Sequence, residues 1–306
     1  MNLLDFEYLQ NNLDTRSLYG SDSCIANLYL LQKKYNTWLK IHNNTLFRYY
    51  YGDESNHGYG FPLPFKNCHS FDSWLKNALD FILQDAFLTK RKVSFCFVTE
   101  EQKRLLDDCL SKNFNLHLSW ETNRNDSDYI YLQSNLANLP GSIYQKKRNH
   151  ISRFKRIYET NWVFKSFPEN DIAQDILYVS KKWFEEKSDI ENQNLIQEKH
   201  SIYRALENKD ILNLKGGVLY VKDKPVAITI ASPISDSVLD IIYEKAIGVY
   251  ERNGAYAMIN QQFAINNPSY KFFNREEDLG LSGLRKAKLS YKPDFLLTKF
   301  YGTIIN

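Results

Sequence analysis

Acidic and basic side chains gather near the C-terminus, in the stretch NREEDLGLSGLRKAKLSYKP at residues 274–293. A carboxylate there could take a proton from an acceptor or hold an ammonium group, and a cation could bind a phosphate. The candidate catalytic residues are Glu244, Glu276 and Asp278. The candidate substrate-binding residues are Lys245, Asn274, Arg275, Arg285 and Lys288. The alternative is a salt-bridge network at a solvated edge, which would only stabilise the fold.

A second charged segment, at residues 141–158, contains six Lys/Arg residues and no acid. If it is a helix, Tyr144, Ile151, Phe154 and Tyr158 form an apolar stripe. The opposite face then carries the candidate phosphate-binding residues Lys146, Asn149, Arg153 and Arg156. Such contacts would make binding to a nucleic acid or an anionic lipid fall steeply with salt. A solvated face on an interdomain helix is the alternative.

The elements that must position these residues follow from the hydrophobic pattern. The first half predicts a strand at 46–53, a helix at 71–88, a strand at 93–99, a helix at 100–113 and a strand at 128–133. The second half predicts helices at 169–187 and 191–208, then strands at 216–221, 225–232 and 238–245. A helix at 252–266, a strand at 270–274, a short helix at 283–290 and a strand at 295–302 complete the chain.

The predicted helix at 252–266 lies between two strands, which implies a right-handed parallel crossover if the strands share a sheet. This order resembles the Gcn5-related N-acetyltransferase fold, in which the two strands splay apart and a ligand enters the gap. Open α/β sheets bind ligands beyond such strand ends. We therefore expect Glu244 and Glu276, at the ends of the two strands, to converge on one ligand.

Composition limits the other classes of function. A chain of 306 residues with 43% hydrophobic residues can form one large domain or two ordinary ones, and a net charge of +3 does not by itself indicate nucleic-acid binding.

The four cysteines, Cys24, Cys68, Cys96 and Cys109, lack metal-ligand spacing, and the pair Cys68-His69 has no second ligand pair nearby. No apolar run is long enough to span a membrane, and the N-terminus has no signal pattern. These features predict a cytoplasmic protein, with peripheral attachment at the inner membrane face left open.

Three segments are identified as similar to one bacterial family. DYIYLQSNLANLPGSIYQKKRNHISRF, IIYEKAIGVYERNGAYAMINQQFA and NREEDLGLSGLRKAKLSYKP together resemble proteins with a phosphatidylglycerol lysyltransferase C-terminal-like domain. The resemblance implies an α+β class with mixed α/β sheets and two tandem acyltransferase folds of the Gcn5-related type. The implied domains are residues 1–140 and residues 141–306, the second beginning with the basic helix.

The resemblance also implies a function. The better-known relatives, aminoacyl-phosphatidylglycerol synthases and peptidoglycan-bridge peptidyltransferases, move amino acids from aminoacyl-tRNA to an acceptor. The implied activity is an aminoacyl-tRNA-dependent transferase acting on a lipid or cell-envelope acceptor, with tRNA and an anionic lipid or membrane surface as partners. No cofactor or metal is expected, because orientation alone can remove about 7–11 kcal/mol of the barrier. The lysyltransferases carry a multi-span membrane domain, which this chain lacks.

Two alternatives stay open. An acyl-CoA-dependent N-acyltransferase would hold its pyrophosphate at the start of the crossover helix, where this chain reads ERNGAYA at 251–257. Glu251 stands where that pattern has Gln or Arg, and Tyr256 where it has a small residue, so acyl-CoA is the less favoured donor. The other alternative is an acyltransferase-like fold that only binds a ligand.

Overall fold

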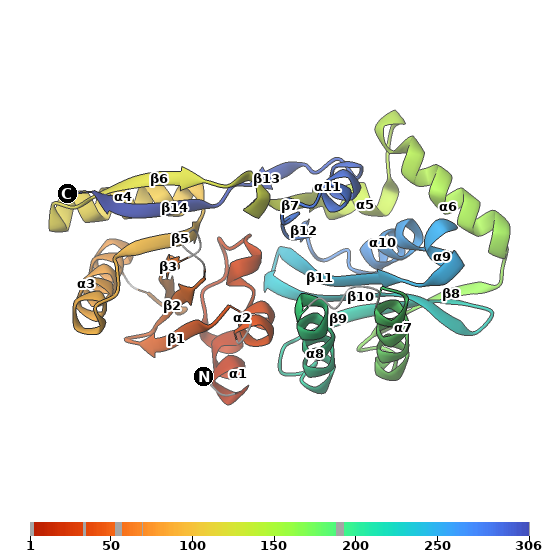
Figure 1. Cartoon of the computed structure of the whole chain (residues 1–306), viewed down its shortest axis with the longest axis horizontal. Helices are drawn as coiled ribbons and strands as arrows, with labels where there is room; N and C mark the ends of the chain where they lie inside the picture. The colour runs from red at the N-terminus through yellow and green to blue at the C-terminus, as the bar shows by residue number, and fades with distance from the viewer. Residues whose placement is uncertain (1–2, 33–34, 53–56, 69, 188–192, 306) are drawn as a thin grey trace.

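Two mixed β-sheets of seven strands each form the frame of the protein, a computed structural model that describes residues 3–32, 35–52, 57–68, 70–187 and 193–305. The sheets lie side by side, with helices packed on them (Figure 1). The predicted α+β class with mixed sheets is confirmed. The end of the strand predicted at 46–53, the start of the helix predicted at 191–208, and His69 lie outside the described residues.

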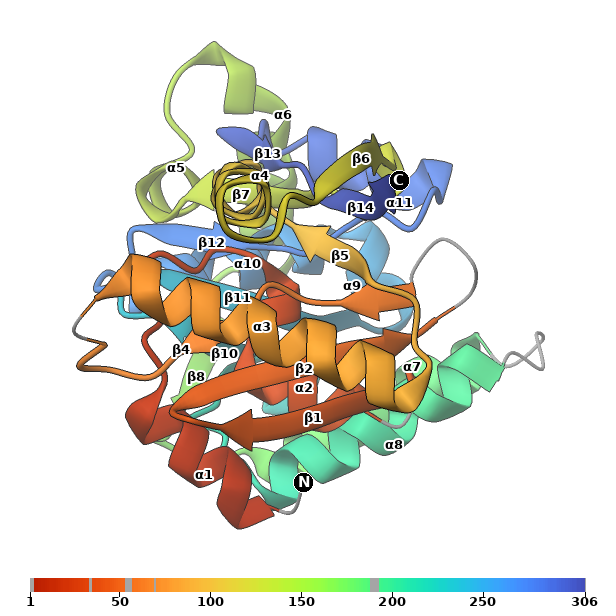
Figure 2. The ribbon, with the colours of Figure 1, turned by 90° about the vertical axis from the view of Figure 1, so that its left-hand side faces the viewer.

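The first sheet has the order β1-β2-β3-β5-β14-β6, with β4 also paired to β2. Its strands are β1 (Thr37–His42), β2 (Thr45–Tyr51), β3 (His57–Tyr59), β4 (Leu63–Pro64), β5 (Ser94–Val98), β6 (His117–Thr122) and β14 (Phe300–Ile305). Its helices are α1 (Leu3–Asn12), α2 (Ile25–Leu31), α3 (Phe71–Thr89) and α4 (Glu100–Phe114), and α3 lies in front of the sheet in Figure 2. Thr99 and Gln102 form a capping box that starts α4.

The second sheet has the order β13-β7-β12-β11-β10-β9-β8. Its strands are β7 (Asp128–Leu132), β8 (Trp162–Phe167), β9 (Lys215–Val221), β10 (Lys224–Ser235), β11 (Val238–Ala246), β12 (Phe272–Asn274) and β13 (Phe295–Leu297). Its helices are α5 (Gln133–Asn138), α6 (Gln145–Tyr158), α7 (Ala173–Glu186), α8 (Gln193–Glu207), α9 (Gly248–Arg252), α10 (Ala255–Asn266) and α11 (Ser282–Leu289). Figure 1 shows α7 and α8 on one face and α9 and α10 on the other.

The predicted crossover is present. Strands β11 and β12 are parallel neighbours joined through α9 and α10, and their pairing ends at Asp240 opposite Asn274. Beyond that pair, β11 continues to Ala246 while β12 has ended. The two strands therefore part at Asp240 and Asn274, which is the opening expected from the sequence.

The chain crosses between the sheets twice, which the predicted domain division did not anticipate. Residues 128–132, assigned to the first domain, form β7 in the second sheet, and residues 300–305, assigned to the second domain, form β14 in the first sheet. The strand predicted at 295–302 is therefore two strands in two sheets. The helix predicted at 252–266 is α10, and the chain turns at Gly254, with φ +102°, between α10 and the short preceding helix α9.

Candidate functional site

The residues that follow β12 form a strained turn at the opening between the strands. Glu276 has φ +55°, in the left-handed region that glutamate rarely adopts. Lys288 of α11 holds this turn, because its Nζ donates to the carbonyl oxygens of Arg275 at 2.5 Å, of Glu276 at 3.0 Å and of Glu277. The backbone N–H of Glu276 donates to Asn274 Oδ1 at 2.7 Å. Lys288 and Asn274 thus position Glu276, and such strain is a common feature of functional sites.

The carboxyl group of Glu276 shares a donor with a second, fully buried acid. Asn27 Nδ2, from α2, donates to Glu276 Oε1 and to Asp240 Oδ2, each at 2.9 Å. Burial, and then the charge of Glu277, raises the pKa of Glu276 to about 8. Burial, and then Glu276, raises the pKa of Asp240 well above its ordinary value. Two carboxyl groups this close do not both ionise readily, so we infer that they share one proton.

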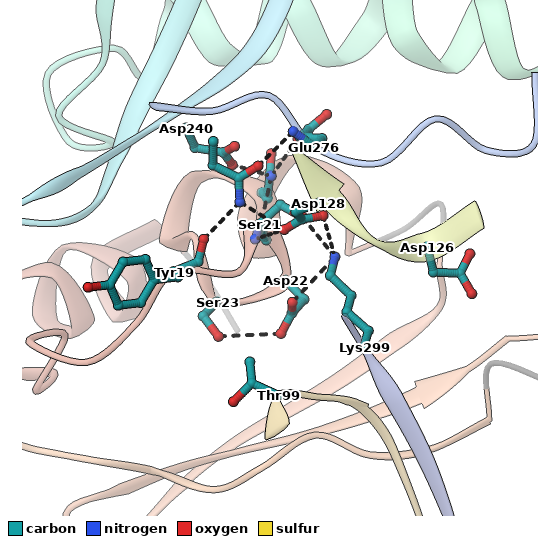
Figure 3. A network of polar contacts seen from close by, with 12 residues as sticks. Tyr19, Ser21, Asp22, Ser23, Thr99, Asp126, Asp128, Asp240, Glu276 and Lys299 are labelled. Carbon is teal, nitrogen blue, oxygen red and sulfur yellow. Dashed lines mark hydrogen bonds and ion pairs between the residues drawn. The ribbon is translucent and has the colours of Figure 1, made fainter. Parts of the chain in front are cut away.

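This pair belongs to a larger network between the two sheets (Figure 3). Asp128 Oδ2 accepts from the backbone N–H of Ser21 and from Asn274 Nδ2, each at 2.8 Å. Asp128 Oδ1 lies 2.7 Å from Lys299 Nζ, which is also 3.6 Å from Asp22. Burial disfavours the ammonium of Lys299, but Asp128 and Asp22 outweigh it and raise its pKa well above the ordinary value.

We call Asp22, Asp128, Asp240 and Glu276 the interdomain carboxylate cluster. Three cations face it: Lys299, Arg48, whose Nη1 lies 3.6 Å from Asp22, and Lys288 beside Glu276. These four carboxylates outnumber the three cations, and the charge of the adjacent Glu277 adds to the excess of negative charge. Asp240 Oδ1 is buried and has no hydrogen-bond partner in the described part of the chain. This oxygen is therefore free to accept a hydrogen bond from a donor that reaches it.

A separate cluster lies on the other side of the opening. Glu244 accepts from Arg275 Nη2 at 2.9 Å, and the Arg275 guanidinium lies 4.7 Å from the Tyr291 ring centre. Lys147 Nζ, from α6, lies 3.4 Å from the same ring centre, and burial, then Arg275, lowers its pKa to about 7. Glu244 Oε1 and Arg275 Nη1 are buried and have no described partner. We call Glu244, Arg275, Lys147 and Tyr291 the Arg275 cluster.

The expectation that Glu244 and Glu276 converge on one ligand is wrong. Glu244 pairs with Arg275, whereas Glu276 pairs with Asn27, because residues 275 and 276 direct their side chains to opposite sides of the chain. Lys245 likewise lies opposite Glu244. Its Nζ donates to Glu198 Oε1 at 2.5 Å and lies 3.7 Å from the Trp183 ring centre, so it packs against α7 and α8.

Two other predicted site residues form a closed ion pair. Asp278 is fully buried and accepts from Arg285 Nε and Nη2, each at 2.8 Å, from the Tyr129 hydroxyl at 2.5 Å and from the backbone N–H of Gly280 at 2.9 Å. Arg285, and then Tyr129, holds the pKa of Asp278 well below its ordinary range. These contacts leave no free oxygen on Asp278. They favour the structural alternative for Asp278 and Arg285.

The predicted basic helix is α6, which projects at the edge of the molecule (Figure 1). Tyr144, Ile151 and Phe154 are buried, which confirms the apolar stripe. The predicted phosphate-binding residues Lys146, Asn149, Arg153 and Arg156 are exposed on this helix. Their side chains make few contacts: Arg153 donates to Asn253 at 3.3 Å and Asn149 accepts from Gln145 at 2.8 Å.

Protein groups occupy the loop at which an acyl-CoA pyrophosphate would bind. A Cβ added to Gly254, the residue before α10, would lie 2.5 Å from the carbonyl oxygen of His150 in α6. The glycine thus permits α6 to pack over the start of α10. The backbone N–H of Gly248, at the start of α9, donates to Glu186 Oε2 at 2.9 Å. This donor lies before the 251–257 loop, and it is already paired.

The described residues contain no group of three or more His, Cys, Asp or Glu side chains that could hold a metal ion. Searched over the same residues, the helices include none that is both long enough and apolar enough to cross a membrane.

Sequence reasoning missed most of the interdomain cluster. Asn27, Asp128, Asp240 and Lys299 are far apart in the chain, and nothing in their spacing predicts that they meet. A signal was present for two of them, because Asp128 and Asp240 are acids within the otherwise apolar strand patterns DYIYL and VLDIIY. A buried acid in a strand is rare and usually has a specific partner.

Comparisons with known proteins agree with this architecture. A family model described as "Phosphatidylglycerol lysyltransferase, C-terminal" matches residues 15–302. The crystal structure of a conserved protein of unknown function from Bacteroides thetaiotaomicron VPI-5482 is 30% identical, with a TM-score of 0.86, covering 100% of this chain and 98% of that chain. The structure of L-PGS from Bacillus licheniformis is 14% identical, with a TM-score of 0.63, covering 98% of this chain and 90% of that chain, and it shows a similar fold. An uncharacterized protein of Mycoplasmoides gallisepticum (strain R(low / passage 15 / clone 2)) is 24% identical over 257 residues, or 75% of this chain and 81% of that protein.

Proposed function

The chain belongs to the phosphatidylglycerol lysyltransferase C-terminal family, a family of transferases with tandem acyltransferase-like folds, and we propose that it transfers an aminoacyl group from aminoacyl-tRNA to a lipid or other cell-envelope acceptor. The observation that supports this most directly is that Asn27 Nδ2 donates to both Asp240 Oδ2 and Glu276 Oε1 at 2.9 Å, where burial raises the pKa of both acids. We infer that this pair holds one proton.

An aminoacyl ester carries an ammonium group that can replace that proton. When the ammonium enters, the nearby positive charge lowers the pKa of both acids and the shared proton leaves. Asp240 Oδ1 offers an acceptor that the protein itself does not use, and Glu276 lies at the opening between β11 and β12. We assign Asp240 and Glu276 the role of holding the donor's ammonium, with Asn274 and Lys288 as positioning residues.

In the transfer step, a hydroxyl or amine of the acceptor forms a bond to the ester carbonyl carbon. The bond from that carbon to the ribose oxygen of the tRNA breaks, and the acceptor's proton passes to the ribose oxygen. Correct orientation can remove about 7–11 kcal/mol of this barrier. A donor to the developing oxyanion is commonly worth about 3 kcal/mol more.

The tRNA is proposed to contact α6. Lys146, Arg153 and Arg156 are exposed on a helix that contains no acid, and Lys147 of the same helix leads inward to the Arg275 cluster. A phosphate backbone along α6 would thus bring its attached ester toward the opening. The acyl-CoA alternative has less support, because the His150 carbonyl oxygen of α6 packs against Gly254, in the loop that its pyrophosphate requires.

The test is to incubate the purified protein with charged tRNA and bacterial lipid extract and, separately, with acetyl-CoA, and to identify products by mass spectrometry. We expect RNase-sensitive formation of an aminoacylated product. Glu276→Gln should abolish it, whereas Glu121→Gln, which removes an exposed carboxyl from β6, should not. A product that forms only with acetyl-CoA and survives RNase would contradict the proposal. No product from a correctly folded protein would favour a purely binding function.

A further inference from the structure

Helix α11 directs two of its three cations, Arg285 and Lys288, toward the protein, while Lys286 and the neighbouring leucines are exposed. Arg285 pairs with the buried Asp278, and Lys288 Nζ donates hydrogen bonds to backbone carbonyl oxygens. The exposed fractions of the neighbouring leucines are 57% for Leu279, 58% for Leu281, 36% for Leu284 and 42% for Leu289. A surface helix normally buries its leucines and exposes its charges. The reversed arrangement indicates that an apolar environment meets this helix from outside.

Cations accompany these leucines. An open groove of about 530 Å³ runs along α11 and is lined by Gly280, Ser282, Arg285, Lys286, Leu289, Ser290 and Lys292. Lys286 and Lys292 are exposed, and neither ammonium has an ion-pair or hydrogen-bond partner among the described contacts. The segment 279–292 contains no acid. Its surface is therefore both apolar and positively charged.

The same surface continues onto the start of α6. The hydroxyl of Tyr144 lies 3.5 Å from the carbonyl oxygen of Lys292, and Lys147 packs on the Tyr291 ring. Next to Tyr144, Ile143 is 60% exposed. The turn that precedes α6 thus adds one more exposed apolar side chain next to Tyr144.

We propose that the leucine–lysine surface, formed by Leu279, Leu281, Leu284, Lys286, Leu289 and Lys292, docks on an anionic phospholipid bilayer. A bilayer interface can accommodate both kinds of side chain. The leucines would enter the boundary between head groups and acyl chains, and the lysines would bind lipid phosphates. An RNA would use the lysines but would leave four exposed leucines in water. This inference rests on the proposed function, because docking would place the opening between β11 and β12 near a membrane-bound acceptor.

The test is flotation of the full chain with vesicles, without any donor substrate. Wild type should float with vesicles of equimolar phosphatidylglycerol and phosphatidylcholine and not with phosphatidylcholine alone. Lys286→Gln with Lys292→Gln should weaken binding about fivefold for each lysine removed. Leu281→Ser with Leu284→Ser should weaken it at least about tenfold. Leu88→Ser on α3, where the leucine is 78% exposed, is the matched control and should float like wild type.

Several results would overturn the proposal. It fails if wild type does not float with the anionic vesicles, or if either α11 double variant floats as well as wild type with an unchanged melting temperature. It also fails if Lys286→Gln with Lys292→Gln loses tRNA binding in a gel shift while vesicle binding persists, which would make this an RNA surface. Because no donor is present, vesicle binding can fail while aminoacyl transfer to a soluble acceptor is retained, so the two proposals are tested separately.

Discussion

Replacing Glu276 by Gln should make the protein more stable at neutral pH while it abolishes transfer. Gln has nearly the shape of a protonated Glu and can still accept from Asn27. The pKa of Glu276 is about 8 in the folded protein against an ordinary value of 4.5. Between these values the folded state keeps a proton that the unfolded state releases. The unfolding free energy of the wild type therefore falls as pH rises. The Glu276→Gln variant has no carboxyl group at this position, so its unfolding free energy does not fall for this reason.

The size of the effect follows from the same shift. Over the two pH units from 5 to 7, one retained proton changes the unfolding free energy by about 2.7 kcal/mol. With an unfolding entropy of about 2.1 cal/mol/K per residue, a chain of this length has about 0.64 kcal/mol/K, so the change is about 4 °C in melting temperature. Glu276 is only partly buried, and solvent screening could halve the effect. We expect about 2–4 °C.

The assay is scanning calorimetry of wild type and Glu276→Gln from pH 5 to pH 8. The difference in melting temperature, variant minus wild type, should grow by about 2–4 °C between pH 5 and pH 7. Glu121→Gln controls for the loss of one charge. If wild type and Glu276→Gln lose melting temperature in parallel, Glu276 is already ionised in the folded protein and the shared proton does not exist.

Three further predictions follow from other contacts. Lys299→Met should lower the unfolding free energy by about 3–5 kcal/mol in urea titrations, because it leaves Asp128 buried and unpaired; a loss below about 1 kcal/mol would mean that the pair is not desolvated. Arg153→Gln with Arg156→Gln should reduce the slope of log tRNA affinity against log salt by about 2 in filter binding, and an unchanged slope would remove α6 from the RNA surface. Gly254→Ala should lower the melting temperature, since its Cβ would lie 2.5 Å from the His150 carbonyl oxygen at φ +102°; a neutral effect would show that α6 is free to move away from α10.

The sequence was most informative where a single helix or strand shows a clear hydrophobic periodicity. The crossover helix with its flanking strands and the apolar stripe of α6 follow from periodicity and chain order, and the structure confirms them. The opening after Asn274 was expected from the resemblance to the acetyltransferase fold, and the strands do part there. Strand β8 was missed because it is an edge strand whose residues are mostly half-exposed, so it shows no continuous apolar run. Its Phe164 and Phe167 rings pack over Gly217 and Gly216 of β9, a cross-strand fit that neither segment reveals alone.

The sequence indicated where in the chain the candidate site lies, but it did not indicate which side chains contact one another there. Position in the chain identified Glu276, Asn274 and Lys288, whereas the direction of each side chain depends on a backbone angle that the sequence does not show. The left-handed turn at Glu276 sends its carboxyl group to Asn27 and away from Glu244. Composition alone also cannot tell a free carboxylate from one that four donors already saturate, as at Asp278.

The exchange of strands between the sheets has a consequence for the interdomain carboxylate cluster. Asp128 begins β7 just after the chain leaves the first sheet, and Lys299 precedes β14 just before the chain returns to it. The two crossings therefore meet at one buried ion pair, 2.7 Å long. Sliding one sheet past the other would have to separate these charges where solvent cannot replace either partner, which is costly. The strand exchange thus fixes the distance between Asn27 of the first half and Asp240 of the second, and the ammonium site that we propose at Asp240 and Glu276 would require that rigidity.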